Sequence, residues 1–181
     1  HEGGPAEVLG FSALQLSPLR DPAALHAEAA SASDVDLDYL VSNGLIVGFD
    51  KWSHPAPMIE AASETERVLL GYMHGNCGHC HNSRASLANL GLFLREELLS
   101  GSDAVLQTIL GQPVKKSAPG QSADAVLRIE PGHPERSAIF ERLSSRYPAL
   151  QMPPLGTVLV DEQALALLKT WIIELEAANG H

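Results

Sequence analysis

The feature that most constrains this chain is a five-residue motif, CGHCH, at positions 77–81. Two thiols three residues apart share one face of a helical turn, and an imidazole follows the second thiol directly. This C-x-x-C-H spacing predicts covalent attachment of one haem c through Cys77 and Cys80, with His81 as the proximal ligand of the iron. His79, between the two thiols, is expected to point outward as a spacer.

Three other interpretations of the cysteine pair are a chance pairing, a disulfide and half of a zinc site. A structural zinc site needs four ligands, and the chain has only these two cysteines. The other histidines do not stand at the spacing typical of zinc fingers. The motif therefore favours haem.

The net charge of the chain limits the kinds of macromolecule that it is suited to bind. Twelve Lys and Arg stand against 22 Asp and Glu, which gives a formal net charge of -10. Such a chain is unsuited to nucleic acid or to an anionic membrane surface. No run approaches the roughly 20 apolar residues of a membrane span. We therefore expect redox partner proteins with a basic docking surface, no nucleic acid and no transmembrane segment.

Apolar spacing and capping residues predict an all-α fold. Regular strand alternation and internal repeats are not evident in the sequence. Irregular structure is expected over residues 1–30, 46–59 and 112–126. Helices are expected over 34–43, from Ser63 into Cys77, over 102–110, over 134–144 and from Asp161 onward. The last of these carries an apolar stripe of Ala164, Leu165, Leu168, Trp171, Ile172 and Leu175.

A single histidine leaves one side of the iron open, so the methionines are candidates for a sixth ligand. Met73 precedes Cys77 on the same helix, which ties it to the proximal side. Met152 stands between a helix end and Pro153-Pro154, where a stiff extended segment can cross the opposite side. Lone methionines commonly fill cores. The two prolines nevertheless favour Met152 as the distal ligand, and His/Met ligation raises the reduction potential of a haem.

Together these features resemble a class I bacterial c-type cytochrome over about residues 64–177. The stretches YMHGNCGHCHN, IEPGHPERSAIFERL and MPPLGTVLVDEQALALLKTWI are similar to the C-terminal haem domain of exported cytochromes that often carry two haems. The resemblance implies a cytochrome c-like helical fold over 61–181, preceded by an N-terminal extension over 1–60. It also implies haem attachment after export, hence a bacterial periplasmic or extracellular, cell-surface location.

The same resemblance implies that the helix before Cys77 crosses the terminal helix near Trp171, with Gly71 permitting the close approach. Two upstream stretches, VLGFSALQLS and LDYLVSNGLI, resemble the segment that joins the two haem sites in that group. A first motif there would end at His1, which makes His1 an axial ligand of a second haem and Met58 its distal ligand. A processing end and a copper site at a terminal histidine are the alternatives for His1.

The predicted function is electron transfer, with His81 and Met152 holding the iron, by a carrier rather than an enzyme. A haem enzyme or gas or redox sensor of peroxidase-like type, in which Met152 is not on the iron, is one alternative. The electron-accepting domain of a larger dehydrogenase is another. Arg142 and Arg128 flank the segment that bears Met152, and either is expected to pair with a haem propionate.

Overall fold

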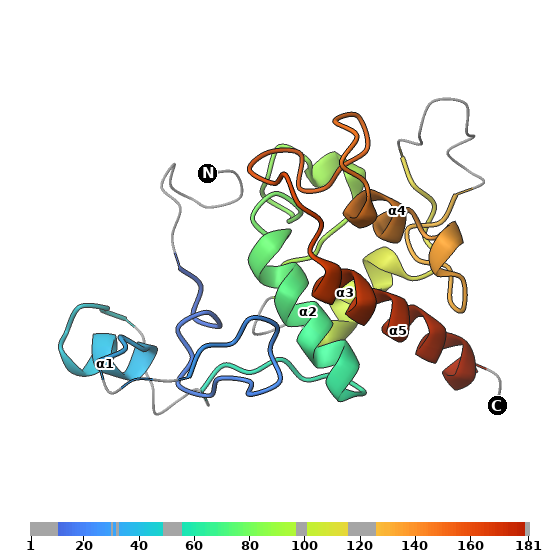
Figure 1. The fold of residues 1–181 in the computed structure, drawn as a ribbon. Helices are drawn as coiled ribbons and strands as arrows, with labels where there is room; N and C mark the ends of the chain where they lie inside the picture. The colour runs from blue at the N-terminus through green and yellow to red at the C-terminus, as the bar shows by residue number, and fades with distance from the viewer. Residues whose placement is uncertain are drawn as a thin grey trace.

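The computed structural model describes residues 11–29, 31, 33–48, 56–96, 101–115 and 126–179. Within these ranges the regular elements are helical and no β-strand occurs, which confirms the all-α class for this part of the chain (Figure 1). None of the described helices is both long and apolar enough to cross a bilayer. The α-helices are α1 (Leu37–Ser42), α2 (Glu64–Asn76), α3 (Gly101–Ile109), α4 (Ala138–Ser144) and α5 (Glu162–Asn179), and the 3-10 helices are η1 (Ala88–Leu90) and η3 (Pro134–Arg136).

Helix α2 begins and ends where its sequence predicts. The Ser63 hydroxyl accepts a hydrogen bond from the Glu66 backbone N–H (3.1 Å), and the Glu66 carboxylate accepts one from the Ala62 N–H (2.9 Å). These bonds satisfy N–H groups that a helix start leaves unpaired. At the other end the Cys77 N–H donates to the Met73 carbonyl (2.8 Å), so the helix leads directly into the CGHCH motif.

Helix α5 is capped by Asp161, whose carboxylate accepts a hydrogen bond from the Ala164 N–H (3.0 Å). Its predicted apolar stripe is confirmed. Four members of the stripe are no more than 1% exposed and two are half-buried; they are Ala164, Leu168, Trp171 and Ile172, then Leu165 and Leu175.

Helices α2 and α5 lie side by side and form the centre of the core (Figure 1). The Trp171 indole N–H donates to the Glu66 carboxylate (3.1 Å), and both side chains are buried. The cluster around this contact also draws on α3, α4 and the segment before η3. Its buried members are Leu69, Leu70, Met73, Leu94, Val105, Ile109, Ile129, Leu143, Ala164, Leu168, Trp171 and Ile172.

One expectation about this crossing is wrong. A Cβ at Gly71 would meet only the Ile59 Cδ1 atom, at the ordinary contact distance of 3.6 Å. Gly71 therefore faces the segment before α2 and does not set the approach of α5.

The helix expected over 134–144 is two elements. Ser137 adopts an extended conformation between η3 and α4 and is 1% exposed. Its hydroxyl accepts from the Glu130 N–H (2.9 Å) and donates to the His133 carbonyl (2.9 Å). Serine competes with helical hydrogen bonding in this way, which explains the break.

The remaining expectations hold in outline. Helix α1 is shorter than the predicted 34–43, because Asp36 caps it and it begins at Leu37. Gly111 follows α3 in the left-handed conformation that favours glycine. Between Ile46 and Ile59 the described residues contain no helix, and the predicted mobile loop from 112 to 126 lies largely outside the described residues.

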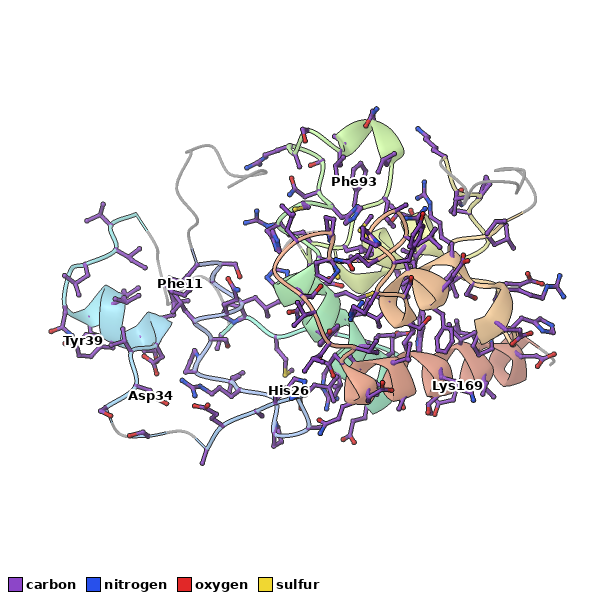
Figure 2. All side chains as sticks on the ribbon, turned by 45° about the horizontal axis from the view of Figure 1, so that its top comes forward. Phe11, His26, Asp34, Tyr39, Phe93 and Lys169 are labelled. Carbon is purple, nitrogen blue, oxygen red and sulfur yellow. The ribbon has the colours of Figure 1, made fainter. Side chains whose placement is uncertain are left out.

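The N-terminal extension contains turns over residues 11–29 and contacts the helical body through polar groups and through Leu25, which packs against the core. Arg67 on α2 forms a two-bond ion pair with Asp21 (2.7 and 3.3 Å). His26 bonds the Asp161 carboxylate (2.9 Å), at the start of α5 (Figure 2). Helix α1 lies away from the body in Figure 1 and buries only Leu37.

We predict that Trp171→Phe lowers the free energy of unfolding by about 2–4 kcal/mol, because it leaves a void and removes a donor from the buried Glu66 carboxylate. Denaturation in urea measures the change. Lys169→Ala is the control, because Lys169 lies on the exposed face of the same helix (Figure 2), and it should change stability by less than about 0.5 kcal/mol. Equal stability of the two variants would contradict the role given to the Trp171 contact.

Candidate cofactor-attachment site

The CGHCH motif forms a closed turn at the C-terminal end of α2. The Cys77 carbonyl accepts hydrogen bonds from the N–H groups of both Cys80 (3.1 Å) and His81 (2.9 Å). Both cysteines are free and half-buried. His79 is exposed, as expected of a spacer. The turn therefore brings two thiols and one imidazole together on a few residues of backbone.

The environment of Cys77 disfavours a thiolate. Burial raises the pKa of the Cys77 thiol to about 12, and the neighbouring Cys80 adds to the shift. Cysteines that exchange disulfides or attack substrates have a lowered pKa instead. The thiol of Cys77 is thus unlike that of a redox-active C-x-x-C pair.

His81 is 9% exposed, and its Nδ1 atom is buried without a hydrogen-bond partner among the described residues. Burial lowers the pKa of His81, and the charges of Arg128, His79 and Arg142 lower it further. A neutral imidazole is the form that binds metals. A buried polar atom without a partner is costly, so this ring suits a site where another group completes its environment.

The backbone of residues 92–96 packs closely against the turn. The Leu94 N–H donates to the His81 carbonyl (2.8 Å). A Cβ at Gly78 would lie 2.7 Å from the His74 carbonyl oxygen and 3.0 Å from the Arg95 Cα. Such separations are not tolerated by backbone atoms, so the first spacer of the motif has room only for glycine.

Arg128 is buried beside this turn. Its guanidinium donates to the Gly91 carbonyl (2.7 Å), the Leu90 carbonyl (2.6 Å) and the Thr108 carbonyl. All three acceptors are neutral, and no described carboxylate forms an ion pair with Arg128. Burial lowers its pKa. The structure thus holds a buried cation whose charge reaches His81.

The segment that carries Met152 follows α4 and is tied to it. The Met152 N–H donates to the Arg142 carbonyl (3.0 Å), and the Arg142 guanidinium donates to the Leu150 carbonyl (3.4 Å). Because the charge of Arg142 also reaches His81, this segment lies on the same side of the molecule as the motif. In both figures the loop between α4 and α5 lies beside the chain that follows α2.

Met58, the predicted distal ligand of a second haem, is not part of this arrangement. Met58 is 58% exposed in the irregular segment before α2. His1 lies outside the described residues, so the second haem site stays a prediction. Met73 is buried in the core, which agrees with its exclusion as a distal ligand.

A buried polar pair that the sequence reasoning missed lies next to the site. The His74 Nδ1 accepts from the Glu96 backbone N–H (3.1 Å), so its Nε2 carries the proton and donates to the Ser12 hydroxyl (2.9 Å). Burial, helped by the Arg95 charge, lowers the pKa of His74 to about 4. Burial and the Glu66 charge raise the pKa of Glu96 to about 7. Only the folded chain brings these groups together, because 22 residues separate His74 from Glu96.

Comparisons of this chain with protein-family models, with curated proteins and with solved structures give no match. Within the described residues, no group of three or more His, Cys, Asp and Glu side chains is arranged to hold a metal ion. A function for the chain is therefore inferred from the residues of the turn and their surroundings.

We predict that Glu96→Gln flattens the pH dependence of stability. The pKa of Glu96 is raised from 4.5 to about 7 on folding, so the wild type loses stability as the pH rises from 4.5 to 7, and the cost is complete above pH 7. At pH 8 the variant should be more stable by roughly 1–3 kcal/mol, as measured by urea unfolding. Glu28→Gln, at an exposed position, is the control and should follow the wild type at every pH. Parallel wild-type and Glu96→Gln curves between pH 4.5 and 8 would refute the assignment.

Proposed function

We propose that this chain is an electron-transfer protein that holds one haem c through thioethers to Cys77 and Cys80, with His81 and Met152 as axial ligands. The observation that carries the proposal is the closed turn from Cys77 to His81, which joins two free thiols to a buried imidazole whose Nδ1 atom has no described partner. When bound, haem supplies an iron that alternates between Fe(II) and Fe(III).

The surroundings of the turn suit such a group. A thioether is uncharged, so burial that disfavours the thiolate of Cys77 does not oppose it. The lowered pKa of His81 keeps the imidazole neutral and able to bind iron. These two residues would then fix the position of the group.

Arg128 supports the proposal through its charge. A buried guanidinium that bonds only neutral carbonyl oxygens among the described residues is stabilised by an added carboxylate. Haem carries two propionates, and we propose that Arg128 pairs with one of them, with Arg142 as the alternative. Arg142 also donates a hydrogen bond to the Leu150 carbonyl, in the segment that bears Met152.

The proposal extends to fold and setting by resemblance. A cytochrome c-like domain would cover residues 61–181, and haem attachment after export would place the protein in a bacterial periplasm or at the cell surface. The net charge of -10 favours a redox partner with a basic docking surface.

We predict that wild type exported through a haem-attachment pathway carries one covalent haem, and that Cys77→Ala or Cys80→Ala prevents complete attachment. Intact mass spectrometry and haem absorption measure the outcome. His79→Ala is the matched control, because His79 is exposed within the same motif, and it should retain the haem. Purified wild type with the apoprotein mass and no haem absorption would defeat the proposal.

We predict that Met152→Ala leaves the sixth coordination position of the haem iron open to small ligands. Loss of the thioether should lower the reduction potential, abolish the charge-transfer band from methionine to ferric iron and allow rapid binding of carbon monoxide. Met58→Ala is the control for loss of a methionine and should leave all three properties unchanged, since Met58 is exposed before α2.

Two outcomes would change either the distal ligand or the proposed function. A Met152→Ala variant that keeps the band and excludes carbon monoxide would show that another residue is the distal ligand. A wild type that binds carbon monoxide at once would favour the haem enzyme or sensor over electron transfer.

A further inference from the structure

Asn82, the residue directly after the motif, is buried at 3% exposure and bonds at both ends of its amide. Its Nδ2 donates to the Gly78 carbonyl (2.9 Å) and to the His79 carbonyl (3.1 Å). Its Oδ1 accepts from the Arg84 N–H (2.9 Å). Since the acceptor end faces an N–H group and the donor end faces two carbonyls, the orientation of the amide is fixed by its partners.

These bonds replace those of a helical turn that does not form. In a continuing α-helix, the carbonyls of residues 78 and 79 would accept from the N–H groups of residues 82 and 83. The chain leaves the helix at this point, so the two carbonyls inside the motif need other donors. The Asn82 side chain supplies both from a single residue.

We propose that Asn82 is a positioning residue that holds the turn from Cys77 to His81 in the form that accepts the haem. The inference rests on the proposed function. With Gly78 pressed against the backbone of Arg95 and the His81 carbonyl bonded by Leu94, the amide of Asn82 completes the restraint of the turn. Cys80 and His81 are thereby presented on a fixed backbone before attachment.

The test compares Asn82→Ala, Asn82→Asp and Asn82→Gln. Asn76→Ala is the matched control, because the Asn76 amide also donates to a carbonyl, that of Tyr72 (2.9 Å), but at an exposed position at the end of α2. The first readout needs no haem: the rate at which iodoacetamide modifies Cys80 in the apoprotein, in a Cys77→Ser background. Asn82→Ala removes three hydrogen bonds, and a net loss of even about 1 kcal/mol should raise this rate about fivefold.

The second readout uses the haem-loaded protein: the fraction of chains with haem, the reduction potential and the ferric electron paramagnetic resonance spectrum, which reports the orientation of the axial imidazole. We expect a lower fraction and an altered spectrum for Asn82→Ala, with part of the loss recovered in Asn82→Gln, which keeps the donors. Asn82→Asp should be worse than Asn82→Ala, because its carboxylate would face two carbonyl oxygens. A residue that merely fills space would show the reverse order, because Asp matches Asn in shape.

The outcomes separate the two proposals. Wild type without haem defeats the proposed function, and the apoprotein measurement still decides the role of Asn82. Wild type with haem, together with Asn82→Ala equal to Asn76→Ala in modification rate, potential and spectrum, overturns the role of Asn82 alone. Circular dichroism checks each variant for folding. If Asn82→Ala does not fold, an Asn82→Gln variant with the modification rate and spectrum of Asn82→Asp overturns the proposal as well.

Discussion

The hydrogen bond from Trp171 to Glu66 fixes the first turn of α2 against α5 inside the core. A buried carboxylate needs donors, and this one has the indole N–H and the Ala62 backbone N–H. The 13 residues of α2 rise about 1.5 Å each, so a restraint at Glu66 also sets where Cys77 lies, about three turns further along. The apolar face of the helix, with Leu69, Leu70 and Met73, keeps the whole length against the core. The position of the motif is therefore decided by contacts remote from it.

The electrostatics around His81 differ from those of the chain as a whole. The net charge is -10, yet Arg128 and Arg142 both act on the pKa of His81. One of these cations is buried against neutral carbonyls. Burial is the main cause that lowers the pKa of His81, and the positive charges add to it; the same charges attract an anionic group to this place. The same charges would thus act on both the proposed iron ligand and the acidic edge of the proposed cofactor.

The sequence predicts local features of this structure well and long-range ones poorly. The Ser63 cap, the start of α2 and the stripe on α5 follow from patterns within a few residues, and all three are confirmed. Gly71 was assigned to the wrong neighbour, because a glycine on a helix does not reveal which segment faces it.

The same limit applies to the polar side chains of the site. The break at Ser137 arises from a hydroxyl that bonds the loop before it, and the contact between Glu96 and His74 joins segments that meet only in the fold. For Asn82 a signal did exist. An asparagine directly after a helical turn is a common capping residue, and here it follows the motif itself.

Helix α2 makes contacts on several of its sides, both with the core and with the N-terminal extension. Its apolar side enters the core, Arg67 holds Asp21, and His74 bonds Ser12 of the N-terminal extension. The extension adds only a little apolar burial to these contacts: α1 buries Leu37, and Leu25 and Ile59 pack half-buried against the core. Its attachment therefore combines a few apolar contacts with polar contacts, and the polar ones contribute less than a core does and respond to salt and pH. Substitutions on this polar side of α2 should consequently weaken the attachment of the extension while leaving the core, and with it the turn at Cys77, in place.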